Sequence, residues 1–260
     1  DKHFLVDTGG YDTTITTTAA QDLGLPITGS LVKRRFIGGL VKGNGTVADT
    51  FQLGDLVSRN MPLGLDPVPG TEKVLDGLIG IDLLLGYDVD LDFGHDKMHL
   101  ISSDHCAGKV VYWPAQSVAE VPMRIVNGHY LINVTLEGHP LVAMVDTGAF
   151  ETVMGAELAH RLFGLDAASP DMQPAGKLNG LVTSYKHKFA VMSFEGIEIH
   201  NATIGIAESP MLERERYATG ARVIRGNAIP WDIILGMDMM RHLHLYIATQ
   251  ERKIYITPAQ

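Results

Sequence analysis

The sequence has very little of several features that mark whole classes of protein. Its 260 residues include one cysteine, Cys106, so no disulfide can form within the chain. No apolar run approaches the roughly 18 residues that a membrane-spanning helix requires, and no basic-then-apolar leader opens the chain. Lys and Arg number 21 against 30 Asp and Glu, which leaves a net charge of −9 that would repel nucleic acid. We therefore expect no disulfide framework, no membrane span and no nucleic-acid partner.

Signatures of metal sites and of other hydrolases are also missing. His242 and His244 stand two apart without a third ligand, and no H-E-x-x-H or G-x-S-x-G motif is present. A twelve-residue calcium loop that began at Asp88 would need glycine at its sixth position and glutamate at its twelfth, where this chain has Phe93 and His99. We therefore interpret the run Asp88–Gly94 as a strand. We expect no metal and no cofactor.

One pattern, by contrast, occurs twice. Residues 4–15 read FLVDTGGYDTTI and residues 143–154 read AMVDTGAFETVM, with two apolar residues before Asp-Thr-Gly in both. Downstream, residues 76–84 read DGLIGIDLL and residues 232–240 read DIILGMDMM. Two motifs in the same order in each half indicate an internal duplication.

The secondary structure predicted around these motifs is mostly strand. Short apolar or alternating runs are separated by Gly, Asn and Pro turn signals, as at 121–126, 129–136 and 141–145. One short helix is predicted in each half, over Thr17–Leu23 and Ala156–Phe163, each ended by a glycine. The fold class is therefore all-β, with two lobes related by a pseudo-two-fold axis. We expect lobes at 1–103 and 119–260, joined by a linker at 104–118.

The two lobes are unequal at their beginnings. Several predicted strands precede Asp146, whereas six residues precede Asp7. We interpret the first lobe as lacking its leading strands, because its true start is missing or has been cleaved. A precursor that is activated by trimming fits the same observation.

An aspartate at a strand end, with glycine two residues later, is a poor way to build a core. A single copy is most often a structural turn, but a pseudo-two-fold axis brings two equivalent copies together. Two adjacent carboxylates, Asp7 and Asp146, share one proton over a range of pH and can activate a water between them. Thr8 and Thr147 are expected to brace the two loops across the axis, while Gly9 and Gly148 let the backbone approach the carboxylates.

With these residues, the sequence resembles the retropepsin-like aspartic proteases. The resemblance rests on Asp-Thr-Gly-Ala at 146–149 and on the apolar-apolar-Gly segments at 78–80 and 234–236, and it covers nearly the whole chain as two tandem copies. It departs from the family pattern at Gly10, where alanine is usual. The resemblance implies that each apolar-apolar-Gly segment packs beneath a catalytic loop. Members of the family are usually homodimers, whereas this chain supplies both halves itself, so we expect a monomer.

The resemblance further implies flaps, which are hairpins that close over a bound peptide. Residues 36–41 (FIGGLV) align with residues 177–182 (KLNGLV), and the tips are expected near 40–46 and 181–187. The expected substrate-binding flap residues are Gly39, Leu40, Val41, Gly180, Leu181, Val182 and Tyr185.

The sequence thus predicts an aspartic endopeptidase that cleaves polypeptides bound in an extended conformation. The alternative is a peptide-binding module of the same fold that holds an extended chain without cutting it, since a fold does not guarantee an activity. Low lysine content, the acidic balance and the expected loss of an upstream segment favour an extracytoplasmic location, in a bacterial periplasm or secreted.

Overall fold

The computed structural model describes residues 1–36, 39–66, 75–178, 182–209, 212 and 230–259, and for residues 30–36 and 39–43 it describes the backbone alone. Strands dominate this part of the chain, and they form two sheets. The chain is therefore an all-β protein with a few short helices, as predicted. No helix among these residues has both the length and the apolar character needed to cross a membrane.

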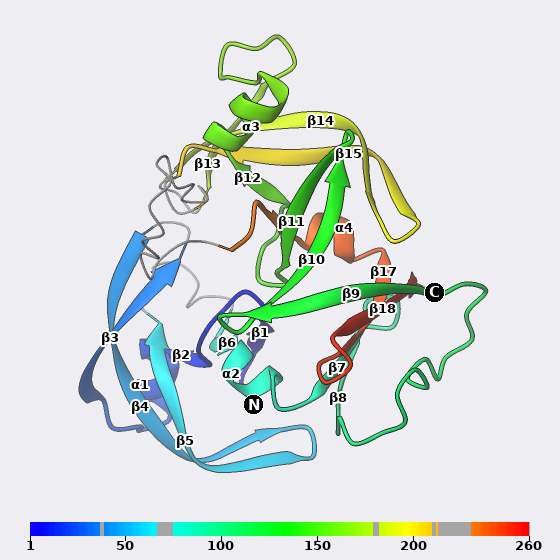
Figure 1. Ribbon diagram of the computed structural model, residues 1–260. Coiled ribbons are helices and arrows are strands. Elements are labelled where there is room, and N and C mark those ends of the chain that lie inside the picture. The colour runs from blue at the N-terminus through cyan, green and yellow to red at the C-terminus, as the bar shows by residue number, and fades with distance from the viewer. Residues whose placement is uncertain (37–38, 67–74, 179–181, 210–211, 213–229, 260) are drawn as a thin grey trace, which may run out of the picture.

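The first sheet contains six strands from the first third of the chain, seen in blue and cyan in Figure 1. Its order is β1 (Phe4–Val6), β6 (Gly77–Ile79), β2 (Thr14–Thr16), β5 (Leu56–Asp66), β4 (Gly39–Leu53) and β3 (Thr28–Phe36). Within it, β1 runs parallel to β6, and β2 runs parallel to β5.

The second sheet contains twelve strands and draws on both halves of the chain. Its order is β13 (Gln173–Leu178), β14 (Val182–Phe194), β15 (Ile197–Ala207), β12 (Val153–Gly155), β16 (Ile233–Leu235), β11 (His139–Val145), β10 (His129–Leu136), β9 (Ala119–Val126), β18 (Lys253–Pro258), β17 (Leu243–Ala248), β7 (Asp88–Asp92) and β8 (Lys97–Ile101).

The duplication read from the sequence recurs in the strand pairing. In the first half β1 pairs parallel with β6, and β2 lies antiparallel to β6 and parallel to β5. In the second half β11 pairs parallel with β16, and β12 lies antiparallel to β16 and parallel to β15. Each half then adds an antiparallel hairpin, β3–β4 or β13–β14. Six strands of each half thus share one order, while β9 and β10 of the second half have no counterpart before β1 in the described part of the chain.

Local sequence explains where these elements begin and end. Asn127 and Gly128 both have positive φ, 52° and 85°, which matches the tight turn that joins β9 to β10. Helix α3 (Ala156–Phe163) ends at Gly164 with φ of 68°, the left-handed conformation that glycine adopts most readily. Helix α1 (Thr17–Asp22) begins after Thr16, whose side chain accepts a hydrogen bond from the Ala19 amide.

Each half also contains a second, one-turn helix that the sequence did not predict. Helix α2 (Ile81–Leu84) follows Gly80, and α4 (Met237–Met240) follows Gly236. Four residues are too few for a helical period to show in the hydrophobic pattern. Each of these helices begins directly after the glycine of an apolar-apolar-Gly segment, so the repeat continues into the helix.

The two halves meet in the second sheet. Strands β7 and β8 come from the first half, yet β7 pairs antiparallel with β17 of the second half, and β9 pairs with β18. One buried core contains residues of both halves, from Ile79 and Leu91 to Ile254. In Figure 1 the β7, β8, β17 and β18 strands lie beside the long connection that leads to β9.

Candidate active site

Asp7 and Asp146 each follow directly after a strand that is paired in parallel. The Asp7 amide donates to the carbonyl of Ile79 at 2.9 Å, and the Asp146 amide donates to the carbonyl of Leu235 at 3.1 Å. The hydrogen bonds to β6 and β16 therefore fix the position along each sheet at which the aspartate loop begins. The two loops are built in the same way, as the repeated sequences require.

The structure brings the two carboxyl groups together. A Cβ added at Gly9 would overlap the carboxyl group of Asp146, and one added at Gly148 would overlap that of Asp7. Each glycine amide also donates at 2.9 Å to Oδ1 of the aspartate two residues before it. Both glycines are therefore needed for close approach, and each carboxylate faces the backbone of both loops.

Two threonines join the loops across the axis. The Thr8 amide donates to Oγ1 of Thr147 at 3.1 Å, and the Thr147 amide donates to Oγ1 of Thr8 at 3.0 Å. The hydroxyl of Thr8 donates to the Val145 carbonyl at 2.8 Å, and that of Thr147 donates to the Val6 carbonyl at 2.6 Å. These four bonds hold the loops in register, in the bracing arrangement that the sequence predicted.

A further pair of supports lies beneath the loops and was missed by the sequence reasoning. Oδ1 of Asp238 accepts from the amide and hydroxyl of Thr152 at 2.9 and 2.7 Å, while Oγ1 of Thr152 accepts from the Gly236 amide at 3.0 Å. Asp82 and Thr13 repeat this network in the first half. The signal was available, because the repeat aligns Thr13 with Thr152 and Asp82 with Asp238.

Burial and charge set the ionisation of the pair. Asp146 is 8% exposed. Its burial raises the pKa of the Asp146 carboxyl well above the usual range, and the charge and hydrogen bonding of Asp7 raise the pKa further. The amides of Gly148 and Ala149 act in the opposite direction without overcoming these effects. One proton is therefore retained on the pair where isolated carboxyl groups would both be ionised.

The two hairpins expected as flaps are present, but their turns lie elsewhere. Phe36 pairs with Gly39, so residues 40–46 lie within β4 and not at the tip of the first hairpin. Leu178 pairs with Val182, so residues 182–187 lie within β14 and not at the tip of the second hairpin. The alignment of the two copies relates the hairpins to each other but does not show where either one turns.

Of the expected flap residues, five lie within strands. Gly39, Leu40 and Val41 begin β4, and Val182 and Tyr185 lie on β14. Gly180 and Leu181 fall outside the described residues. On the same strand, Lys186 forms an ion pair with Glu151, a residue of the loop that follows Asp146. This contact links the second hairpin to the carboxylate loop.

Across the described part of the chain, no group of three or more His, Cys, Asp and Glu side chains is arranged to hold a metal ion. Asp7 and Asp146 are a pair of adjacent acids, and burial and mutual contact retain a proton on the pair. Such a pair can accept a proton from water through one carboxylate while the other, protonated, donates to a carbonyl oxygen.

The sequence of the chain matches a known protein family. The sequence model of a family described as aspartyl protease matches the chain over residues 1–89 and 132–239. No curated protein matches the chain. Among solved structures, a retropepsin-like aspartic protease from Rickettsia conorii is 18% identical to it. That match covers 56% of this chain and 96% of the other, with a TM-score of 0.37.

Proposed function

The chain belongs to the aspartyl protease family, and from that premise we propose that it is an endopeptidase with Asp7 and Asp146 as its catalytic carboxylates. The observation that carries the proposal is that each carboxyl group packs against the glycine of the other loop, so that a Cβ at Gly9 or Gly148 would overlap it, and that the two carboxyl groups interact. A shared proton, held on Asp146 by burial and by the charge of Asp7, supports the same role.

The reaction follows from this proton arrangement. The Asp7 carboxylate takes a proton from a water, whose oxygen bonds to the carbonyl carbon of the substrate, while protonated Asp146 donates its proton to the carbonyl oxygen. In the second step Asp7 gives its proton to the amide nitrogen, the carbon–nitrogen bond breaks, and Asp146 regains a proton from the tetrahedral intermediate. Both aspartates return to their starting states. Gly9, Gly148, Thr8 and Thr147 hold the two loops in place throughout.

The substrate in this proposal is a polypeptide in an extended conformation, bound by a chain acting as a monomer. The hairpins β3–β4 and β13–β14 act as flaps, through Gly39–Val41, Gly180–Val182 and Tyr185. Residues 1–103 and 119–260 form the two lobes, with 104–118 between them, and β7–β8 of the first lobe extend the sheet of the second. A binding module that holds a peptide without cutting it has no use for a shared proton.

The test is the replacement of either aspartate by asparagine. We expect Asp7→Asn and Asp146→Asn each to lower kcat/KM for an unfolded protein substrate by at least about 100-fold, since each removes one acid–base group. The exposed Asp49 of β4 provides a matched control, because Asp49→Asn makes the same change away from the pair. Circular dichroism of each variant checks that the fold is intact. Normal cleavage by either folded dyad variant would exclude the mechanism.

A further inference from the structure

A second cluster of charged groups lies on the sheet that the two halves share. Asp88, Asp90 and Asp92 occupy alternate positions of β7, so their side chains leave the same face of the sheet. Val89 and Leu91, between them, enter the core on the opposite face. We call the three carboxylates the aspartate ladder and residues 104–118 the connecting segment.

The ladder is buried, which is unusual for carboxylates on the outer face of a sheet. Asp88 is 1% exposed and Asp90 is 0% exposed. Buried carboxylates are retained in proteins where charged or hydrogen-bonding partners compensate for the loss of water. Each of the three has at least one histidine within ion-pair distance.

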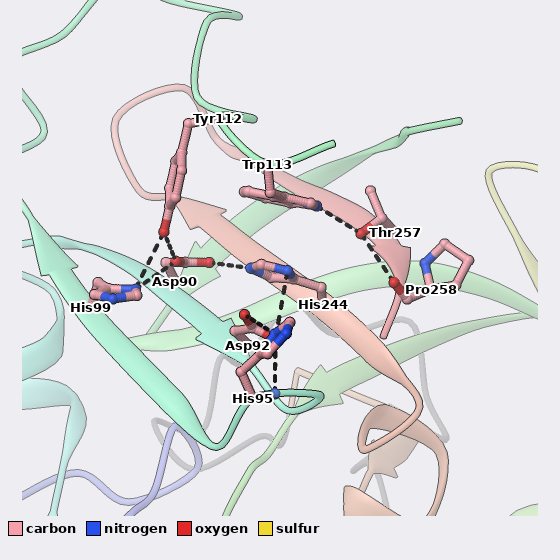
Figure 2. Close-up of polar contacts among 9 residues, drawn as sticks. All are labelled: Asp90, Asp92, His95, His99, Tyr112, Trp113, His244, Thr257 and Pro258. Carbon is pink, nitrogen blue, oxygen red and sulfur yellow. Dashed lines mark hydrogen bonds and ion pairs between the residues drawn. The ribbon is translucent and has the colours of Figure 1, made fainter. Parts of the chain in front are cut away.

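Asp90 is the centre of the cluster, as Figure 2 shows. Nε2 of His244 lies 2.6 Å from one of its carboxylate oxygens, and Nδ1 of His99 lies 2.9 Å from the other. The hydroxyl of Tyr112, from the connecting segment, donates to the same carboxylate. His244 comes from β17 and His99 from β8, so this one side chain joins both halves and the connecting segment.

Trp113 covers the cluster from above. Its ring stacks on the imidazole of His244, with centroids 3.8 Å apart and planes 11° from parallel, and its Nε1 donates to Oγ1 of Thr257 at 3.0 Å. Figure 2 shows His244 between Trp113 and the carboxylates of Asp90 and Asp92. Nδ1 of His244 is 3.9 Å from Asp92. The connecting segment therefore packs directly on the imidazole that contacts Asp90 and Asp92.

Asp88 makes the second link to the connecting segment. Nε2 of His105 lies 2.5 Å from Asp88, whose other oxygen accepts from the Thr249 amide at 2.9 Å. Val110 of the segment is buried against Tyr246 of β17 and Tyr255 of β18. Charged and apolar contacts thus fix the segment at both ends of the ladder.

We propose that the aspartate ladder, its histidines and the connecting segment form a pH-sensitive clasp between the two halves of the protein. The clasp is closed in mildly acidic solution, where the ion pair between His105 and Asp88 is formed, and it loosens as the solution becomes alkaline. Because the halves carry one member each of the carboxylate pair, a closed clasp holds the two loops in register. That consequence for catalysis rests on the proposed function, whereas the clasp itself does not.

The direction of the pH effect follows from His105. Its hydrogen bond to Asp88 raises the pKa of the imidazole, although burial acts against this, and Glu251 adds a smaller increase. A histidine with a raised pKa stabilises the folded state fully below its ordinary pKa, and this stabilisation is lost as pH rises through the raised value. Two tyrosines also face this pair: Tyr246 places its ring on His105 and its hydroxyl on Asp88, and Tyr130 lies near Asp88.

The lower end of the pH range in which the clasp is closed is set by Asp92. Burial acts to raise the pKa of its carboxyl, but the hydrogen bond from His95 and the charge of His244 outweigh burial and lower the pKa. This contribution is present above the ordinary pKa of an aspartate and is lost as pH falls through the lowered value. The clasp therefore spans the mildly acidic range.

The test is amide hydrogen exchange of the full chain across pH, corrected for the intrinsic rate, in the wild type and in His105→Gln. In the wild type, we expect the protection of residues 88–92 and 104–118 to fall by about tenfold between about pH 6 and pH 9, because the ion pair between His105 and Asp88 is lost over this range. His105→Gln should show low protection at every pH. His200→Gln is the matched control, because His200 pairs with Glu198 in an exposed position on β15.

A second measurement covers the case in which His105→Gln does not fold. The ring resonances of His105 in the wild type should titrate above about pH 6.5, the ordinary value for histidine. Titration at or below that value, or wild-type protection that does not change with pH, would overturn the clasp. A chain that shows the exchange change but cleaves no peptide would support the clasp and contradict only the proposed function.

Discussion

At the scale of single residues, the site depends on positions where no side chain can be added. The Cα of Gly148 faces the carboxyl of Asp7, so Gly148→Ala forces the two loops apart. We expect kcat/KM to fall at least about 100-fold, since a small displacement of catalytic groups has an effect of this order. Gly29→Ala on β3 is the matched control, because a Cβ there meets nothing within 4 Å. Peptide cleavage measures both, and full activity in Gly148→Ala would show that the loops are not held in contact.

His129 supplies a second prediction at this scale. It is 1% exposed, and its ring packs edge-on against Tyr11 and against Trp231. Burial lowers the pKa of His129 to about 4. A lowered histidine pKa means that stability is complete above the ordinary value of about 6.5 and is lost as pH falls from there toward 4.

His129→Phe removes this acid sensitivity, because the phenyl ring fills the same space and takes up no proton. Both proteins lose unfolding free energy between about pH 7.5 and about pH 4. We expect this loss to be smaller in the variant than in the wild type, by on the order of 2 kcal/mol. Urea denaturation at the two pH values measures the difference. His200→Gln should leave the pH dependence of the wild type unchanged. A variant as acid-sensitive as the wild type would place the sensitivity in another group.

At the scale of elements, each carboxylate loop rests on a threonine and on an aspartate that lies in the first turn of a one-turn helix. Thr152→Val keeps the shape of the side chain but leaves the Gly236 amide without its acceptor and removes the hydrogen bond from the Thr152 hydroxyl to Asp238. We expect a loss of about 1–3 kcal/mol in unfolding stability, the usual cost of an unsatisfied buried group, together with reduced activity. Thr203→Val, an exposed change on β15, is the control. Thermal unfolding tests the stability, and an unchanged Tm for Thr152→Val would argue against this support.

The elements also show where sequence reasoning succeeds and where it stops. Asp7 and Asp146 were predictable because the duplicated motif supplies both members and the symmetry that unites them. The clasp was not, because its histidines at 95, 99, 105 and 244 share no local spacing, and the alternating aspartates of β7 match any solvated strand. The pairing of β7 with β17 joins residues more than 150 positions apart, and no periodic pattern encodes such a contact. The hairpin tips were misplaced because the alignment of residues 36–41 with residues 177–182 relates the two copies to each other without showing where either hairpin turns.

At the scale of the whole molecule, the shared sheet makes the two halves one folding unit. Leu91 of β7 is 4% exposed and packs in a core that includes β9, β17 and β18 of the second half. Disruption of this contact should therefore destabilise both halves together rather than unfold one alone. Two independent lobes, by contrast, would unfold in separate steps.

Leu91→Ala tests this cooperativity. We expect a loss of about 2–5 kcal/mol, the usual range for removing a buried leucine side chain, within a single transition that shifts as a whole. Leu23→Ala, at a position 52% exposed, should change stability by less than about 0.5 kcal/mol.

Far-ultraviolet circular dichroism reports the strands of both halves. Fluorescence reports Trp113 and Trp231, which lie in the connecting segment and the second half. Coincident curves from both probes follow from a shared sheet, because β7 and β17 can separate only when both halves lose their core. A circular dichroism step without a fluorescence change would mean that the first half unfolds alone.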